Sequence, residues 1–206
     1  MSNEPIIVDN FLHLLNQNKI ANIFQSSEIN WMLKMLPSYG DKLAHIVFDQ
    51  EDKQAWEDSP TLFHNLYFKN QTTDVSMIGD YVIKSFRQAI EKHIDAKIEI
   101  IRCMVIAVIP NPNFTAQSMM PHTDWTIPHE TCLYYINSTD GDTVLFDQKY
   151  DVSLSIDDND GKKKNVFTKI SPLKGRAALF DGLQYHASNP SKTDLRFVLN
   201  INYVRV

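Results

Sequence analysis

The chain has 206 residues, of which 43% are hydrophobic and 22% charged, with a formal net charge of −5 at pH 7. This composition excludes a disordered, collagen-like or coiled-coil chain and provides enough apolar material for one sizeable core. The acidic balance argues against a general binder of phosphate backbones, and no stretch approaches the roughly 18 consecutive apolar residues that span a bilayer.

The N-terminal half, residues 1–96, is predicted to be a support region of helices and strands. Periodicity and turn residues predict a strand at 5–8, a helix at 12–24, and strand-like pieces at 29–35 and 62–68. The clearest helix is 78–94, where Ile78, Val82, Phe86 and Ile90 fall on one face.

The C-terminal half, residues 97–206, changes to short strands separated by turn sequences. The predicted strands are 98–109, 131–137, 143–146, 165–171, 176–181 and 195–204. Closely spaced strands of this kind are typical of an antiparallel sandwich or barrel of jelly-roll type. We therefore expect a single domain over 1–206, with an all-β jelly-roll core at 97–206 and flanking helices.

The cysteine content and the N-terminus bear on location. The start of the chain lacks the basic segment and long apolar segment of a signal peptide. The two cysteines, Cys103 and Cys132, cannot build a disulfide scaffold, and both stand in apolar runs where buried free thiols are the usual outcome. The sequence therefore predicts a cytoplasmic protein.

Two His-x-Asp sequences occur, at His93 and Asp95 and at His122 and Asp124. On a helix, residues i and i+2 point apart, so the first pair, at the end of the predicted helix, cannot share a ligand. On a strand or strand end these positions share a face, so the second pair can converge. We interpret His93 as a partly buried cation near a helix C-terminus, and His122 and Asp124 as candidate metal ligands.

A third candidate ligand is His186, which follows the predicted strand 176–181 and an Asp-Gly turn. Two neutral imidazoles and one carboxylate form the facial triad of non-haem Fe(II) oxygenases, which leaves three coordination positions open. Taken alone, His186 is better interpreted as a hydrogen-bonded surface histidine.

Arg196 stands inside the apolar run 195–199 of the last predicted strand. An arginine in a buried strand is unfavourable unless an anion pairs with it. Alternation places Arg196 with Val198, Asn200 and Asn202 on a polar face, which we expect to line a cavity. A planar guanidinium suits a carboxylate ligand, although a salt bridge to one of the protein's own acids is the alternative.

The order His122-x-Asp124, His186 and Arg196 resembles the iron- and 2-oxoglutarate-dependent oxygenases, in particular the prolyl-hydroxylase-like branch. The segments 131–137 (TCLYYIN), 140–146 (DGDTVLF) and 175–180 (GRAALF) are similar to strands of that branch. The start of the chain is similar to that of many such proteins, including uncharacterised bacteriophage members. Val198 stands where many members carry the serine of an Arg-x-Ser motif, and the branch that uses a tyrosine instead commonly lacks this serine.

The resemblance implies a double-stranded β-helix and an enzyme that oxidises an organic substrate, by default through hydroxylation, while 2-oxoglutarate and O₂ become succinate and CO₂. It implies that Arg196 and Tyr135 hold the far carboxylate of 2-oxoglutarate. Ascorbate would be the reductant. The implied ligands of Fe(II) are His122, Asp124 and His186.

The neighbouring residues carry weaker signals. Trp125 is a candidate wall of the substrate side and equally a packing residue, whereas Pro128 marks His129 as a loop residue rather than a ligand. The lysine run 162–164 is expected to be the solvated tip of a hairpin rather than a nucleic-acid site. The primary substrate, a peptide side chain or a small molecule, is not identified by these patterns.

Two other functions stay open at this point. One is a cupin-like jelly-roll metalloprotein that needs no 2-oxoglutarate, although cupins usually carry His-x-His with a later Glu and His. The other is a jelly-roll binding module whose histidines are incidental.

Overall fold

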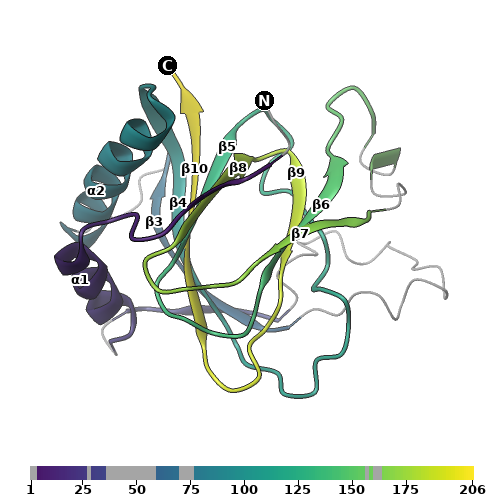
Figure 1. Cartoon of the computed structure of the whole chain (residues 1–206), viewed down its shortest axis with the longest axis horizontal. Coiled ribbons are helices and arrows are strands. Elements are labelled where there is room, and N and C mark those ends of the chain that lie inside the picture. Colours follow the sequence, from purple (N-terminus) through teal and green to yellow (C-terminus); the bar gives the residue numbers. More distant parts are fainter. Residues whose placement is uncertain (1–3, 27–28, 36–58, 70–76, 156–157, 160–163) are drawn as a thin grey trace.

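The computed structural model describes residues 4–26, 29–35, 59–69, 77–155, 158–159 and 164–206. In this part of the chain, two helices cover one face of a seven-stranded sheet, and a three-stranded sheet lies on its other side (Figure 1). All strand pairings are antiparallel. The predicted all-β jelly-roll core with flanking helices is confirmed. Neither described helix has the length and apolarity that a bilayer crossing requires.

The large sheet joins both halves of the sequence. Its strands lie in the order β1 (Ile6–Val8), β8 (Ala177–Asp181), β5 (Glu130–Tyr135), β10 (Arg196–Arg205), β4 (Ile98–Val108), β3 (Thr61–Phe68) and β2 (Met32–Lys34). The N-terminal half therefore supplies both edge strands of this sheet, together with β3. Residues 36–58 lie outside the described residues.

The small sheet contains a strand that the sequence analysis missed. Its order is β7 (Val166–Ile170), β6 (Thr143–Lys149) and β9 (Gln184–Ser188). The prediction placed His186 after a strand, whereas it lies in the middle of β9. The polar residues Gln184 and His186 share one face of this short strand, so the expected apolar signal is absent there.

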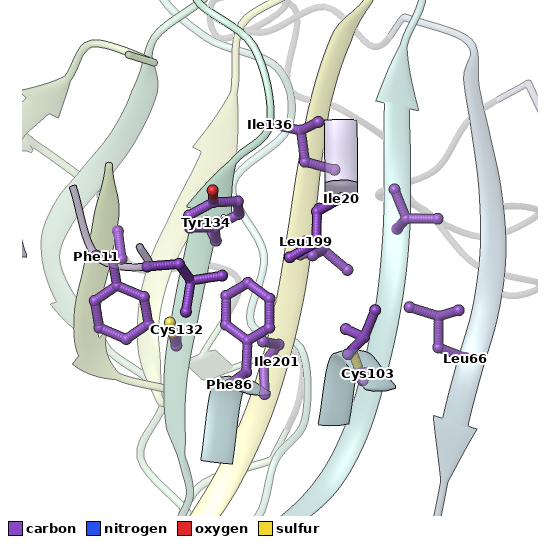
Figure 2. Close-up of a cluster of buried hydrophobic side chains, with 14 of the residues drawn as sticks. Phe11, Ile20, Leu66, Phe86, Cys103, Cys132, Tyr134, Ile136, Leu199 and Ile201 are labelled. Carbon is purple, nitrogen blue, oxygen red and sulfur yellow. The ribbon is translucent and has the colours of Figure 1, made fainter. Parts of the chain in front are cut away.

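The main hydrophobic core lies between the helices and the outward face of the large sheet (Figure 2). Helix α1 (Leu14–Phe24) contributes Ile20 and Phe24, and helix α2 (Met77–Ile94) contributes Phe86 among other apolar residues. Both cysteines face this core as buried free thiols, as predicted, and burial raises the pKa of Cys103 to about 12.

The end of α2 differs from the prediction in detail. The helix ends at Ile94, and Asp95 adopts a left-handed conformation with φ of 50°, which terminates the helix, so it does not share the helix with His93. His93 is exposed rather than partly buried, although its ring stacks on that of Phe11 with the ring centroids 5.0 Å apart. Neither His93 nor Asp95 belongs to a cluster of metal-binding side chains among the described residues.

The lysine run at 162–164 is only partly visible, since residues 162 and 163 lie outside the described residues. Lys164 is buried, and its ammonium nitrogen lies 4.4 Å from the centre of the Tyr185 ring. The prediction of a solvated cluster is therefore wrong for Lys164, because the aromatic ring stabilises the desolvated cation.

Candidate metal centre

A cavity of about 360 Å³ opens between the two sheets. Along β4, the residues Arg102, Met104, Ile106 and Val108 face the cavity, while the alternate residues face the helices. Strand β10 behaves in the same way, since Val198 and Asn200 line the cavity and Leu199 and Ile201 pack in the core. The alternation predicted for the last strand is observed.

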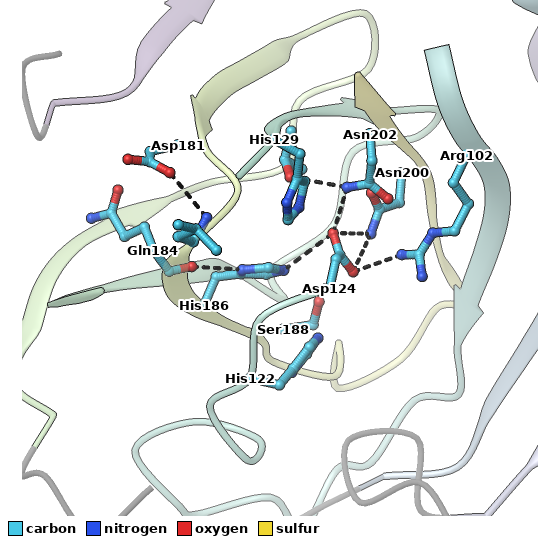
Figure 3. A network of polar contacts seen from close by, with 12 residues as sticks. Arg102, His122, Asp124, His129, Asp181, Gln184, His186, Ser188, Asn200 and Asn202 are labelled. Carbon is cyan, nitrogen blue, oxygen red and sulfur yellow. Dashed lines mark hydrogen bonds and ion pairs between the residues drawn. The ribbon is translucent and has the colours of Figure 1, made fainter. Parts of the chain in front are cut away.

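Three candidate ligands meet at this cavity (Figure 3). The donor atoms of His122, Asp124 and His186 all lie within 4.8 Å of one another. His122 and His186 exchange two backbone hydrogen bonds of 2.9 Å, so the loop that carries His122 and Asp124 is fixed against β9. The structure therefore brings His186 of β9 to His122 and Asp124, which lie close together in the sequence but far from His186.

Each of the two imidazoles is oriented by a contact between its Nδ1 atom and a backbone carbonyl oxygen. Nδ1 of His122 lies 3.1 Å from the carbonyl oxygen of Met120, and Nδ1 of His186 lies 3.1 Å from that of Gln184. Because a carbonyl oxygen only accepts, each Nδ1 must carry a proton, and in the neutral form of each ring the lone pair is then on Nε2. Burial lowers the pKa of His186 to about 4, which keeps this imidazole neutral. Neutral imidazoles are the form that binds a metal.

The Asp124 carboxylate is held by three side chains. Arg102 donates to it at 2.7 Å, Asn200 at 3.0 Å and Asn202 at 2.8 Å, and only 5% of the Asp124 side chain is exposed. Burial alone would raise the pKa of Asp124, but the positive charge of Arg102 and the hydrogen bond from Asn202 contribute to a net shift far below its usual range. Asp124 is therefore an ionised carboxylate in a fixed position, as a metal ligand requires.

Arg102 is a site residue that the sequence analysis missed. Asn200 and Asn202 were expected on the cavity face, but not as partners of Asp124. A signal for Arg102 was present, since it interrupts the apolar strand 98–109 in the same way that Arg196 interrupts the last strand.

Arg196 is completely buried and has hydroxyl partners. It donates to Oγ1 of Thr143 at 2.6 Å and to Oγ of Ser188 at 3.1 Å, and its Nε has no partner among the described residues. The ion pairs found within the described chain do not include Arg196. Burial lowers the pKa of its guanidinium. The alternative of a salt bridge to an internal acid is not supported among the described residues.

Tyr135 lies beside Arg196 and faces inward, whereas Tyr134 packs in the core under the helices. The Tyr135 hydroxyl donates to Oγ1 of Thr143 at 2.8 Å, the same oxygen that Arg196 contacts. Its ring centre lies 5.5 Å from the guanidinium carbon of Arg196. Thr143 and Ser188 complete this polar cluster, and sequence reasoning did not single out either of them.

Trp125 and His129 lie next to the metal-ligand candidates rather than among them. The Trp125 ring packs edge-on against Phe68 and His129, at centroid distances of 5.5 and 6.2 Å, and it is not among the cavity-lining residues. Nδ1 of His129 lies 2.7 Å from the carbonyl oxygen of Ile127, and His129 is not in the three-residue cluster. The role of Trp125 as a substrate wall stays a prediction.

Known proteins resemble this chain in structure rather than in sequence. No protein-family model matches the chain, and no curated protein sequence is similar to it. An oxidoreductase of the 2OG-Fe(II) oxygenase family from Burkholderia pseudomallei superposes with a TM-score of 0.60 at 10% identity, over 97% of this chain and 84% of that one.

Two prolyl hydroxylases are similar in the same way. The Trichoplax adhaerens enzyme, solved with a peptide fragment of hypoxia inducible factor, has a TM-score of 0.57 at 17% identity, over 98% of this chain and 84% of its own. A prolyl-4-hydroxylase from Pseudomonas putida has a TM-score of 0.54 at 12% identity, over 100% of this chain and 94% of its own. The fold of this chain is therefore that of the 2OG-Fe(II) oxygenases.

The side chains present fit the groups that this fold family uses. Two imidazoles with free Nε2 lone pairs and one ionised carboxylate are the donor set of the facial triad for Fe(II). A desolvated guanidinium with hydroxyl neighbours suits a carboxylate ligand.

Proposed function

We propose that the chain is an Fe(II)- and 2-oxoglutarate-dependent dioxygenase, by default a hydroxylase. One observation carries the proposal: the cavity that holds His122, Asp124 and His186 is also lined by Ser188, whose hydroxyl accepts a hydrogen bond from the fully buried Arg196, and this arginine has no ion pair among the described residues. Burying an arginine without a carboxylate partner is costly, and a group of histidines without a function would give no reason for that cost.

Each residue has a definite task in this proposal. Nε2 of His122, Nε2 of His186 and the Asp124 carboxylate would hold Fe(II), which when bound supplies the redox chemistry that couples conversion of 2-oxoglutarate and O₂ to substrate oxidation. Arg102, Asn200 and Asn202 fix the Asp124 carboxylate, so that it does not have to reorganise when the metal binds.

The cosubstrate would be oriented by the polar cluster at the start of β10. Arg196 would bind the far carboxylate of 2-oxoglutarate, while Tyr135 and Thr143 would donate or relay hydrogen bonds to it. Leu133 and Val198 line the cavity with apolar surface and would exclude water from this ligand.

The finer assignments are part of the same proposal. The substrate would be a peptide side chain or a small molecule, with prolyl-hydroxylase-like chemistry as the first case to examine. Ascorbate would keep the iron reduced, and the buried free thiols agree with a cytoplasmic location.

The experiment is succinate production from 2-oxoglutarate by the purified chain with Fe(II), O₂ and ascorbate, in the absence of a primary substrate. Wild type should form succinate slowly, His186→Ala should form none, and His93→Ala, on the outside of α2, should match wild type. Metal binding without 2-oxoglutarate binding would favour the cupin-like alternative instead. No metal binding would favour the binding module.

A further inference from the structure

Lys34 is the charged residue of the cavity that the proposed chemistry does not use. It lies at the end of β2, the edge strand of the large sheet, and lines the same cavity as the metal-ligand candidates. None of the ion pairs of the described chain involves Lys34. Among the described residues, no carboxylate therefore competes with a ligand in the cavity for its ammonium group.

The charges around the cavity are not balanced. Among the described residues that line it, Lys34, Arg102 and Asp124 carry a formal charge. Arg102 and Asp124 pair at 2.7 Å and neutralise one another, which leaves the charge of Lys34. Fe(II) and the 2-oxoglutarate dianion have opposite and equal charges, so their binding would not remove this excess. The described lining of the cavity therefore favours an anionic substrate.

Beyond Thr61, which pairs with Lys34, the wall between Lys34 and the metal-ligand candidates is apolar. Phe63 on β3 and Met104 and Ile106 on β4 line this part of the cavity. Their side chains offer neither a strong donor nor a strong acceptor, so they suit a hydrocarbon stem. The cosubstrate would lie on the other side, over β10 and β5, because Arg196 and Tyr135 belong to those strands.

The register of the sheet sets the length of that stem. Lys34 pairs with Thr61, Thr61 with Val108, and Val108 with Arg196, so these four residues form one row across β2, β3, β4 and β10. Three strand spacings of about 4.8 Å place Lys34 about 14 Å across the sheet from β10. Asp124 is held by Asn200 and Asn202, which lie four and six residues further along β10 than Arg196, so a ligand that reaches from Asp124 to Lys34 must be extended.

We propose that the primary substrate carries an anionic head group, a carboxylate or a phosphate, on an extended apolar stem, and that Lys34 binds this head group. The inference rests on the proposed function, because it assumes that the metal and cosubstrate occupy the β10 side. The stem then lies along Phe63, Met104 and Ile106 and presents a carbon to the metal centre.

The test is calorimetric titration of decanoate, decyl phosphate and decanol into the full chain loaded with Mn(II) and 2-oxoglutarate. Wild type should bind decanoate or decyl phosphate at least tenfold more tightly than decanol, and the tighter of the two identifies the head group. Butyrate, whose stem is too short to cross the apolar wall, should bind at least tenfold more weakly than decanoate.

Three variants isolate the lysine. Lys34→Gln should reduce the preference for the anion at least tenfold, while Lys34→Arg should keep most of it. Lys69→Gln is the matched control, because Lys69 follows β3, pairs with Glu99 at 2.8 Å and does not line the cavity. Its preference should equal that of wild type.

The inference is overturned if wild type binds decanol as tightly as both anions, if butyrate equals decanoate, or if Lys34→Gln keeps the full preference. Failure of the proposed function can be distinguished from failure of this inference. In that case wild type would not bind Mn(II) or 2-oxoglutarate when it is loaded, before any decanoate is added. A wild type that binds both but shows no anion preference refutes the role of Lys34 alone.

Discussion

Replacing Arg196 by leucine should abolish tight binding of 2-oxoglutarate without unfolding the protein. Arg196 has no exposed surface, so a carboxylate that binds it does so in a desolvated environment. Removing one partner of such a pair costs about 3–5 kcal/mol. At about 1.4 kcal/mol per decade, the dissociation constant should rise roughly a hundredfold to a few thousandfold. Mn(II) affinity should change little, because Arg196 is not among the candidate ligands.

The same substitution should have little effect on the stability of the metal-free protein. The partners that Arg196 loses are the hydroxyls of Thr143 and Ser188, and each hydrogen bond from a charged group is worth about 1.5–3 kcal/mol. Leucine also removes the desolvation penalty of the guanidinium and leaves no described carboxylate unpaired, which offsets that loss. We expect the free energy of unfolding to stay within about 2 kcal/mol of wild type.

Arg205→Leu is the matched control, because Arg205 lies at the other end of β10 and pairs with Glu130. It should leave 2-oxoglutarate affinity unchanged and lower stability, since the Glu130 carboxylate, only 12% exposed, loses a partner. The measurements are calorimetry with Mn(II) in place of iron and urea unfolding. An Arg196→Leu variant that binds 2-oxoglutarate as tightly as wild type would refute the assignment of this arginine.

Three further substitutions test the site and its support. His186→Ala should lower Mn(II) affinity at least a hundredfold by calorimetry, since one of three ligands is lost, whereas His93→Ala should be silent; equal affinities would exclude His186 as a ligand. Tyr135→Phe removes a hydroxyl that bonds Thr143 and should weaken 2-oxoglutarate binding about tenfold, a smaller loss than for the arginine. Gly182→Ala should lower the free energy of unfolding by about 1–3 kcal/mol in urea, because the new Cβ would overlap the ring of His129; wild-type stability would show that the ring moves aside.

Much of the architecture was predictable because it depends on local patterns. The predicted ends of the helix at 78–94 and of the long strand at 98–109 agree with the structure within one or two residues. Apolar residues recur every 3.6 positions in a helix and every second position in a strand, and this pattern can be found without knowing which element packs against it. Strand β9 was missed because its polar residues face the site and break the apolar signal. Asp95 was expected to share the helix with His93, but its left-handed backbone places it just beyond the end of the helix at Ile94.

The candidate site was likewise predictable only in part. Arg196 could be selected from the sequence because a charged residue among apolar neighbours in a strand is unusual. His122 and Asp124 could be selected because residues i and i+2 share a face on a strand or strand end, and His186 as the third ligand that such a pair needs. Their convergence followed from the resemblance to a family, and the structure shows it directly for the three ligand candidates.

The sequence by itself determined which faces of the strands are polar and which residues could bind a metal, since both depend on side-chain chemistry and alternation along one strand. Only the tertiary structure decided that Arg102 pairs with Asp124, that Thr143 and Ser188 surround Arg196, and that Lys34 shares the cavity. These relations join strands that are far apart in the chain, and pairing register, which no local pattern contains, brings them together.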